Sequence, residues 1–383
     1  MNERLKLDIK KLNAALNTTF EADIQSGRVG GIAALVMQNG KTVYQNCFSN
    51  EKLGIHVSEH TIFRLASMSK PVTTAAVLIL ADRGELRLDD PVYYYIPEYE
   101  TMNLGRVNEN GLEIVGPAKN QITIRHLLTH SSGIGGGPVG QYVSSQLPTK
   151  ERKCLEQTVK FFAQNPLDYE PSTRQAYSGV NAFDVLSRIV EIVSQMSFSR
   201  FLEKEIFVPL GMTDTTFTPT KEQWGRMIPM HTYEEGEGKI VDFPENSIFE
   251  GIPTTCFSGG AALASTLYDY KLFADMLLHY GSARGKQLIG EKWIREMARP
   301  QLPDHVMKND RRNWGLGVRV ITNHPDNVLP CGTFGWSGAY GGHFWVDPVN
   351  EIVAVYLKNS RYDGGSGAQT GVRFEKDVYA SFL

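Results

Sequence analysis

The spacing of apolar residues along the chain predicts helices in several segments. Between Val72 and Leu80, apolar side chains recur every three or four residues and so share one face of an α-helix. Gly84 ends this pattern, as a residue just past a helix end often does. The sequence also favours helices over residues 3–26, 122–130, 151–164, 181–196, 199–208 and 368–382, and from a cap at Ser265 or Thr266 to Leu278.

Short apolar or alternating runs predict strands near both ends of the chain. Asn39-Gly40 is a hairpin turn signal, and Asp347-Pro348-Val349-Asn350 is a turn with proline at its second position. The predicted strand segments are 30–37, 41–48, 258–264, 314–321, 342–346 and 352–357. Segments with strands therefore bracket a middle, from 85 to about 250, that is rich in helix fragments.

Length and composition restrict the class of protein. A chain of 383 residues is too long for one simple core, so we expect one large domain or two closely packed ones. With 42% hydrophobic and 21% charged residues, the balance is that of a globular enzyme. The net charge is −3, and no basic stripe indicates a nucleic-acid partner.

The cysteines and the N-terminus bear on location. Four widely spaced cysteines, without a C-x-x-C pair, predict free thiols in a reducing compartment. The first residues carry mixed charge and lead into no apolar core of a signal peptide. No apolar run reaches 18 residues, so we expect a cytoplasmic protein without a membrane span.

The segment Ala66-Ser67-Met68-Ser69-Lys70-Pro71 carries the strongest chemical signal. It contains Ser-x-x-Lys directly before the apolar helix, so Ser67 is predicted at a helix N-terminus with Lys70 one turn further on the same face. A serine hydroxyl becomes a good nucleophile when a neighbouring base takes its proton, and the helix N-terminus favours a developing oxyanion. The other match, Ser49-Asn50-Glu51-Lys52, lacks such a helix.

Other candidate sites are weaker on their own. Tyr177 precedes a helix, where a tyrosine usually only packs, although a Ser–Lys pair needs a further proton carrier. The glycine-rich run from Phe334 to His343 is equally consistent with a bulged edge strand.

Metal, phosphate and α/β-hydrolase sites are each disfavoured by the sequence. His126 and His130 have the spacing of zinc ligands, but Leu127 replaces the required glutamate, so they are expected to fix the following loop. Gly135-Gly136-Gly137 lacks the lysine of a phosphate loop. No Gly-x-Ser-x-Gly occurs, which argues against an α/β-hydrolase.

Taken together, three motifs resemble those of the serine β-lactamase and penicillin-binding-protein superfamily. Ser67-Met68-Ser69-Lys70, Tyr177-Ser178-Gly179 and Trp336-Ser337-Gly338 follow the order of S-x-x-K, Y-x-N and K/H-T/S-G, and the likeness extends from about residue 28 to 358. Trp336 departs from the lysine or histidine of the third motif, and this W-x-G form resembles the family VIII carboxylesterases. Gly179 replaces the asparagine of the second motif. Both departures favour esters over β-lactams or D-Ala-D-Ala peptides.

The resemblance implies an α+β fold of the β-lactamase/transpeptidase type. An α/β part with a central antiparallel sheet would comprise residues 1–66 and 255–383, and a mostly helical part would comprise 67–254, with the active site in the cleft between them. Ser67 would be the acylated nucleophile, and Lys70 and Tyr177 would move its proton. The backbone N–H groups of Ser67 and Ala339 would form the oxyanion hole.

The resemblance also implies that Trp336, Ser337 and Gly338 line the substrate pocket and that no metal or cofactor takes part. Three functions remain open. The first is a serine esterase acting on small to medium acyl esters, with a small-molecule partner. The second is a β-lactamase, amidase, D-peptidase or acyltransferase on the same fold. The third is a non-catalytic binding protein. The sequence does not indicate the oligomeric state.

Overall fold

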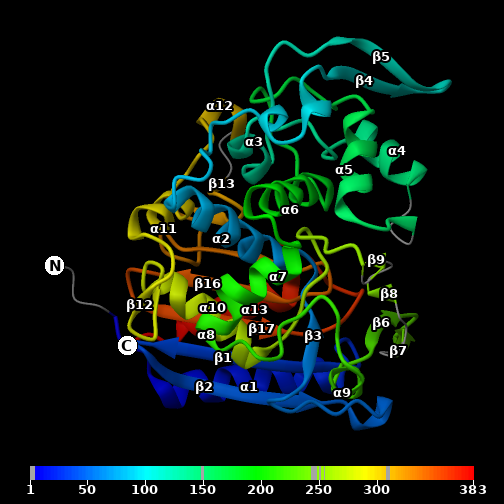
Figure 1. Ribbon diagram of the computed structural model, residues 1–383. Helices are drawn as coiled ribbons and strands as arrows, with labels where there is room; N and C mark the ends of the chain where they lie inside the picture. The colour runs from blue at the N-terminus through cyan, green and yellow to red at the C-terminus, as the bar shows by residue number, and fades with distance from the viewer. Residues whose placement is uncertain (1–4, 148–150, 243–247, 250–251, 254, 308–310) are drawn as a thin grey trace.

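The computed structural model describes residues 5–147, 151–242, 248–249, 252–253, 255–307 and 311–383, and a seven-stranded sheet lies at its centre (Figure 1). The strand order is β13-β14-β15-β16-β17-β1-β2, and every neighbouring pair is antiparallel. The strands are β1 (Gly31–Gln38), β2 (Lys41–Ser49), β13 (Arg312–Trp314), β14 (Arg319–Ile321), β15 (Phe334–Ser337), β16 (His343–Asp347) and β17 (Ile352–Leu357). The predicted α+β fold with an antiparallel sheet is confirmed.

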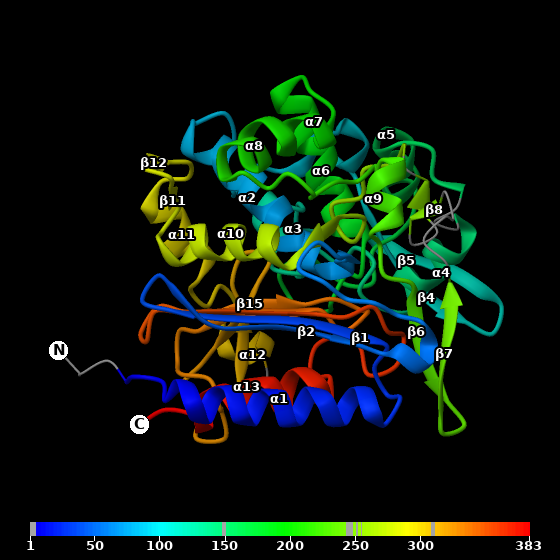
Figure 2. The ribbon, with the colours of Figure 1, turned by 90° about the horizontal axis from the view of Figure 1, so that it is seen from below.

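Two terminal helices cover one face of the sheet, as Figure 2 shows below it. They are α1 (Ile9–Gln25) and α13 (Gln369–Ala380), and their apolar side chains form one buried cluster with the strands. The first helix begins later than predicted because the Asp8 side chain caps it, accepting hydrogen bonds from the N–H groups of Lys10 and Lys11. The two ends of the chain meet where Leu7 and Phe382 form an antiparallel bridge.

The other face packs against α10 (Leu267–Leu278), whose N-cap is Thr266, one of the two caps that the sequence predicts. Beyond it lies α2 (Ser69–Asp82), which packs against α6 (Asn181–Ser194). Since α2 is apolar on nearly every side, thirteen of its residues are buried, which makes it a core helix rather than an amphipathic one.

The remaining elements surround these helices. The helices are α3 (Ile124–Leu128), α4 (Pro138–Gln146), α5 (Leu155–Ala163), α7 (Phe198–Leu202), α8 (Val208–Leu210), α9 (Lys221–Gly225), α11 (Glu291–Met297) and α12 (Asp304–Met307), with 3-10 turns at Glu51–Leu53, Ala66–Met68, Val92–Tyr94 and Pro97–Tyr99. The short strand pairs are β3 (Ile62–Arg64) with β10 (Ala264–Thr266), β4 (Asn103–Asn108) with β5 (Gly111–Pro117), β6 (Met230–Glu234) with β7 (Glu237–Asp242), β8 (Ile248–Phe249) with β9 (Ile252–Pro253), and β11 (Ser282–Ala283) with β12 (Lys286–Gln287).

Three sequence predictions are corrected by this arrangement. The segment 314–321 is not one strand, because Gly317 has a φ of 65° and turns the chain between β13 and β14. The segment 258–264 is not a strand, because residues 259–261 form a turn, residues 262 and 263 are irregular, and only Ala264 begins a strand. The predicted helix 199–208 is divided, since residues Glu203–Phe207 form a π-helix between α7 and α8.

One apolar core extends through both predicted parts of the chain. It includes Phe63 and Val355 from the sheet-bearing part and Leu78 and Val185 from the helical part. The boundary at 66/67 therefore stays a prediction, and the boundary at 254 lies outside the described residues.

Two further expectations from the sequence concern the cysteines and a membrane span. All four cysteines carry free thiols, as the sequence predicts. Within the described ranges, no helix combines the length and the apolar character needed to cross a membrane.

Candidate active site

Ser67 lies in the 3-10 turn that leads into α2. The residue before it, Ala66, has a φ of 45°, a left-handed conformation that is uncommon for a side chain with a Cβ. Two hydrogen bonds fix the residues that follow Ser67 in this turn. The Tyr270 hydroxyl donates to the Met68 carbonyl over 2.9 Å, and the Leu263 N–H donates to Ser69 Oγ over 3.1 Å. The turn is therefore fixed by α10 and by the segment before β10.

Lys70 is completely buried beneath Ser67. Its Nζ donates to Ser67 Oγ over 3.1 Å, and to the carbonyls of Gly179 over 2.5 Å and Gly260 over 2.8 Å. The predicted proximity of Ser67 and Lys70 is present. The two carbonyl acceptors aim the Lys70 amino group at the Ser67 hydroxyl and give its buried N–H groups hydrogen-bond partners.

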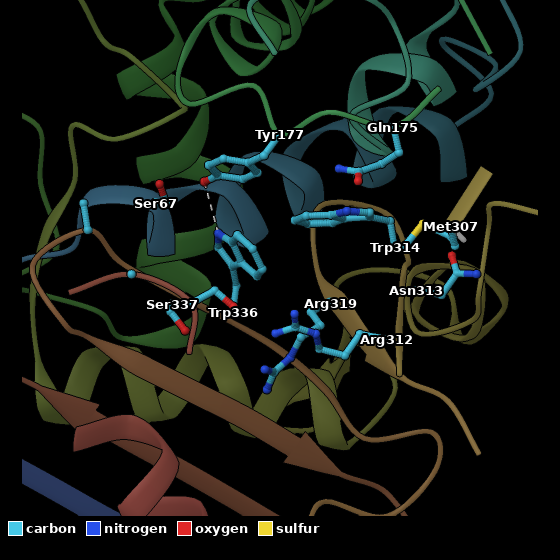
Figure 3. Close-up of a pocket in the computed structure, with 13 residues that line it drawn as sticks. Ser67, Gln175, Tyr177, Met307, Arg312, Asn313, Trp314, Arg319, Trp336 and Ser337 are labelled. Carbon is cyan, nitrogen blue, oxygen red and sulfur yellow. Dashed lines mark hydrogen bonds between the residues drawn. The ribbon is translucent and has the colours of Figure 1, made fainter. Parts of the chain in front are cut away.

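Tyr177 contributes a ring and a hydroxyl to the same place. Lys70 Nζ lies 5.0 Å from the centroid of the Tyr177 ring. The ring stacks on Trp314, with centroids 5.8 Å apart and planes at 15°. The Trp336 indole N–H donates to the Tyr177 hydroxyl oxygen over 3.3 Å, the contact drawn as a dashed line in Figure 3. Aromatic contacts and one hydrogen bond thus hold Tyr177 beside Lys70.

The His130 ring packs against Tyr177. Its Nδ1 accepts the Ser178 N–H over 3.1 Å, and its ring lies 4.6 Å from the Tyr177 ring and 4.4 Å from that of Trp314. Burial, and next the charge of Lys70, lower the pKa of His130 well below its usual range, so the imidazole is neutral. These contacts are with the segment that carries Tyr177 and with β13, so the expectation that His130 fixes the loop directly after it stays a prediction.

The other residues that could suggest a metal or a phosphate site have structural partners. His126 Nδ1 accepts the Thr123 N–H in a capping box at the start of α3. The N–H groups of Gly137, Val139 and Gly140 all donate to the carboxylate of Asp168. Among the residues described by the structure, no cluster of three or more histidine, cysteine or acidic side chains could hold a metal ion.

The third motif forms the end of β15 and the turn after it. In this turn the Gly341 N–H donates to the Gly338 carbonyl, so Ala339 occupies the second turn position, whose N–H is not used by the turn itself. Gly338 is required by close packing, since a Cβ there would lie 2.4 Å from the Leu65 carbonyl oxygen. This contact joins the Ala339 turn to the chain just before Ser67.

Residues of all three motifs line one cavity of about 410 Å³. Ser67, Tyr177, Trp336, Ser337 and Ala339 line it, as the sequence predicts for a shared site, whereas Gly338 is not on its wall. Figure 3 shows Ser67, Tyr177 and Trp336 grouped on one side of this cavity.

Trp314, Arg312 and Arg319 are among the lining residues that the sequence analysis missed. They reach the cavity from the hairpin of β13 and β14. The alternation of residues 314–321 carried a signal for a strand, but not for the turn that brings these side chains to the cavity.

A hydrogen-bonded row leads from Ser337 to one of these arginines. Ser337 Oγ bonds His343 Nδ1 over 2.8 Å, His343 Nε2 bonds Glu375 Oε1 over 2.9 Å, and Arg319 Nη2 donates to the same oxygen over 2.9 Å. Burial acts to raise the pKa of Glu375, but the hydrogen bonds and charges of His343 and Arg319 outweigh it and lower the pKa to about 2. The carboxylate is therefore ionised near neutral pH.

Comparisons with known proteins identify the family of the chain. A family model described as Beta-lactamase matches residues 16–373. Protein Rv1367c of Mycobacterium tuberculosis is 30% identical over 353 residues, covering 87% of this chain and 86% of its own. Esterase EstB of Burkholderia gladioli is 27% identical over 405 residues, covering 98% of this chain and 97% of its own.

A solved structure gives the same result for the fold. The structure described as EstCE1, a hydrolase with promiscuous acyltransferase activity, superposes with a TM-score of 0.81 at 23% identity. The match covers 97% of this chain and 99% of that one. At this identity the likeness concerns the fold, and it extends over nearly the whole chain.

Proposed function

The chain belongs to the β-lactamase family, and from that premise we propose that it is a serine esterase acting on small to medium acyl esters. One observation carries the proposal: Lys70 Nζ lies 3.1 Å from Ser67 Oγ at the wall of a cavity that also holds Tyr177. A hydroxyl within hydrogen-bond reach of a buried base is the arrangement that nucleophilic catalysis needs. Esterase EstB, similar over 98% of the chain, supports the choice of esters.

In the proposed reaction, Ser67 Oγ attacks the ester carbonyl carbon. The Lys70–Tyr177 pair takes the hydroxyl proton, and the negative oxygen of the tetrahedral intermediate accepts hydrogen bonds from the N–H groups of Ser67 and Ala339. The bond to the alcohol oxygen then breaks, and the pair gives that oxygen the proton. Water repeats the sequence on the acyl-enzyme, releasing the carboxylic acid and restoring Ser67.

Two departures from the family motifs support esters over β-lactams. Trp336 offers an apolar face and one N–H donor where the family pattern has a lysine or histidine. Its N–H is already directed at Tyr177. Gly179 supplies only its carbonyl, to Lys70, and has no side-chain amide with which to hold a substrate amide. An ester has no amide group of its own to hold, and so does not require that contact.

Acyl transfer is the second candidate. The structural neighbour EstCE1 is described as a hydrolase with promiscuous acyltransferase activity. The walls contributed by Trp314, Trp336 and Tyr177 would favour an alcohol over water as the acceptor of the acyl group. The two activities share the Ser67 acyl-enzyme and differ only in the second step.

The test combines a probe and a substrate screen. A fluorophosphonate should label Ser67, and p-nitrophenyl esters of increasing chain length should be hydrolysed with kcat/KM well above that for a chromogenic cephalosporin. Added alcohols, followed by product analysis, measure the share of acyl transfer. Labelling without turnover of any ester would exclude the esterase, and absence of labelling would favour a binding protein on this fold.

A further inference from the structure

The turn that carries the Ala339 N–H is bound by a segment that follows the strand β17, residues 359–365. Two N–H groups of this segment donate hydrogen bonds to carbonyls of the turn, one on each side of Ala339 in the sequence. The donors and acceptors are Ser360 to Tyr340 over 3.0 Å, and Gly365 to Gly338 over 2.9 Å.

The same segment also contacts the chain that leads to Ser67. Asn359 Oδ1 accepts a hydrogen bond from the backbone N–H of Arg64, three positions before Ser67, over 3.2 Å. The proposed oxyanion hole uses the N–H groups of Ser67 and Ala339. The segment 359–365 therefore connects the strand that leads to one donor with the turn that carries the other.

Close packing leaves the turn little room to move. A Cβ on Gly364 would lie 1.8 Å from the Ala339 carbonyl oxygen, and a Cβ on Gly341 would lie 1.9 Å from Lys358 Cε. Gly341 also has a φ of 88°, which a residue with a Cβ rarely adopts. The turn is thus in direct contact with the backbone of the segment 359–365 and with the stem of Lys358.

Lys358 directly follows β17, and its side chain is completely buried. Its Nζ donates to the carbonyls of Asp363 over 2.9 Å and Tyr362 over 3.3 Å. Asp363 has a φ of 52°, which is uncommon for a residue with a side chain, and its carboxylate accepts the N–H groups of Gln369 and Thr370 at the start of α13. One buried amine therefore joins the end of β17 to the segment that leads into α13.

The Lys358 amine carries its proton at neutral pH. Burial lowers the pKa of Lys358 from 10.5 to about 8; the charges of Asp363 and Asp23 act against this shift, and that of Arg373 adds to it. A buried ammonium group that loses its hydrogen-bond partners costs free energy. The two carbonyl acceptors, and with them the segment 359–365, are held in place for this reason.

We propose that Lys358 is a positioning residue for the oxyanion hole, because its buried amine holds the segment 359–365 against the turn that carries Ala339. The proposal rests on the proposed esterase function. Lys358 does not line the cavity of Ser67, so it acts through the turn. An oxyanion hole works by donors that are fixed in advance where the negative charge develops, so a displaced Ala339 N–H slows the reaction more than it weakens substrate binding.

The test compares Lys358→Met with the unaltered protein. This substitution removes the amine and keeps an unbranched stem beside Gly341. We expect kcat for p-nitrophenyl butyrate to fall about tenfold or more, towards the loss of about 100-fold that follows from deleting an oxyanion donor, and KM to change less than about threefold.

Val378→Ala is the control for a general loss of stability. Val378 is buried in the apolar cluster of the terminal helices, near the end of α13, whereas Asp363 binds the start of that helix. Its truncation should lower the melting temperature and leave kcat unchanged. Equal losses of kcat in Lys358→Met and Val378→Ala would overturn the positioning role.

Two inhibitors separate the oxyanion hole from the rest of the site. With 1,1,1-trifluoro-4-phenyl-2-butanone, Ser67 Oγ forms a bond to the carbonyl carbon, the hydroxyl proton passes to the Lys70–Tyr177 pair, and the carbonyl oxygen becomes the anion that the oxyanion hole binds. The corresponding alcohol, 1,1,1-trifluoro-4-phenyl-2-butanol, cannot form this adduct. Lys358→Met should weaken inhibition by the ketone by about the factor lost in kcat/KM and leave inhibition by the alcohol unchanged. Equal losses for ketone and alcohol would overturn the proposal.

Gly364→Ala tests the same contact without altering a buried charge, and so serves if Lys358→Met does not fold. Gly364 is exposed, but its new methyl group would press on the Ala339 carbonyl. We expect the same selective loss of kcat and of ketone inhibition, with little change in melting temperature. Unchanged kcat and ketone inhibition in every variant that folds would overturn the proposal.

Hydrogen–deuterium exchange separates this proposal from the esterase itself. Amides of residues 334–343 should exchange faster in Lys358→Met than in the unaltered protein, because their turn has lost its support. Faster exchange there in a protein that hydrolyses no ester would uphold the hold of Lys358 on the turn and exclude the esterase. Ester hydrolysis by the unaltered protein, with kcat and exchange unchanged in Lys358→Met, would do the reverse.

Discussion

The indole N–H of Trp336 donates a hydrogen bond to the hydroxyl oxygen of Tyr177 over 3.3 Å, although 159 positions separate the two residues. Their rings are also in contact, with centroids 5.3 Å apart. A lysine or histidine at position 336 could bring a positive charge to this oxygen, whereas tryptophan brings a neutral donor and a large apolar surface. Trp336, which departs from the family pattern in the third motif, therefore also fixes the position of Tyr177 in the second motif.

Trp336→Phe removes this donor and keeps an aromatic ring in the wall. We expect kcat for p-nitrophenyl acetate to fall about three- to tenfold, the range that follows from losing one hydrogen bond of about 1 kcal/mol, with a smaller change in KM. Steady-state kinetics measure both. Trp314→Phe is the control, since that ring stacks on Tyr177. An unchanged kcat in Trp336→Phe would show that the bond does not act on the reaction.

Ser67→Ala should abolish ester turnover and labelling by a phosphonate, because no other hydroxyl lies over Lys70 Nζ in the described contacts. We expect a loss of kcat of at least about a thousandfold, in line with removal of a nucleophile. Ser49→Ala is the matched control from the second Ser-x-x-Lys match, where Ser49 Oγ only accepts the Val57 N–H. Mass spectrometry should find the adduct on the peptide containing Ser67 and on no other.

Lys70→Ala and Tyr177→Phe should each remove most of kcat, and the double variant should be scarcely worse. Groups that act as one proton-transfer unit give non-additive losses. Lys70 Nζ lies 5.0 Å from the Tyr177 ring centroid, which is consistent with one unit. Melting temperatures identify any variant that merely fails to fold. Losses that multiply in the double variant would assign the two residues to separate steps.

Trp336→Lys should narrow the gap between short-chain esters and β-lactams, since it restores a cation at the family position. Gly179→Asn tests the second departure with less risk of damage, because a Cβ at this position meets nothing within 4 Å. It should leave folding unchanged and raise the relative rate with substrates that contain an amide. Parallel assays with p-nitrophenyl butyrate and a chromogenic cephalosporin measure both effects. Efficient cephalosporin hydrolysis by the unaltered protein would contradict the esterase assignment.

Glu375→Gln should lower stability at neutral pH and make it less dependent on acid. The folded protein lowers the pKa of Glu375 from 4.5 to about 2, so the ionised carboxylate stabilises the fold above about pH 4.5, and this contribution is lost as the pH falls towards 2. The shift in pKa corresponds to about 3 kcal/mol of stability at neutral pH. Thermal unfolding between pH 2 and 7 should show the two proteins converging in acid. Glu291→Gln, at an exposed ion pair with Arg295, should change little.

The sequence predicted best where the residues that make an element or a motif are adjacent. The Asn39-Gly40 hairpin and the helix after Ser67 depend on a few neighbouring residues, and the structure has both. Thr266, one of the two caps that the sequence predicts, accepts a local hydrogen bond from the Asp269 N–H. The three motif positions Ser67, Tyr177 and Trp336 were found because a resemblance joined segments that spacing alone could not.

What the sequence missed depends on pairing between segments. The run from Trp314 to Ile321 alternates like one strand, but the Gly317 N–H donates to the Leu128 carbonyl and the chain turns back there. Arg319 then pairs with Trp314 across the hairpin, and the spacing of apolar residues in the sequence does not indicate this pairing. Pairing between segments determined the structure at these positions. The hairpin of β4 and β5 was missed for a different reason: no residue of either strand is buried, so no apolar face marks them as strands.

Lys70 has consequences for the order in which this chain can recover its activity after unfolding. Its amino group donates hydrogen bonds to the carbonyls of residues that are 109 and 190 positions away, so it keeps its hydrogen-bond partners on burial only after three distant segments have come together. Local helical turns form early in refolding, whereas contacts between distant segments form slowly. The circular dichroism of the helices should therefore recover before ester turnover does. Enzymatic activity would then report the last step of assembly, and a kinetic trap with native-like helices would be inactive.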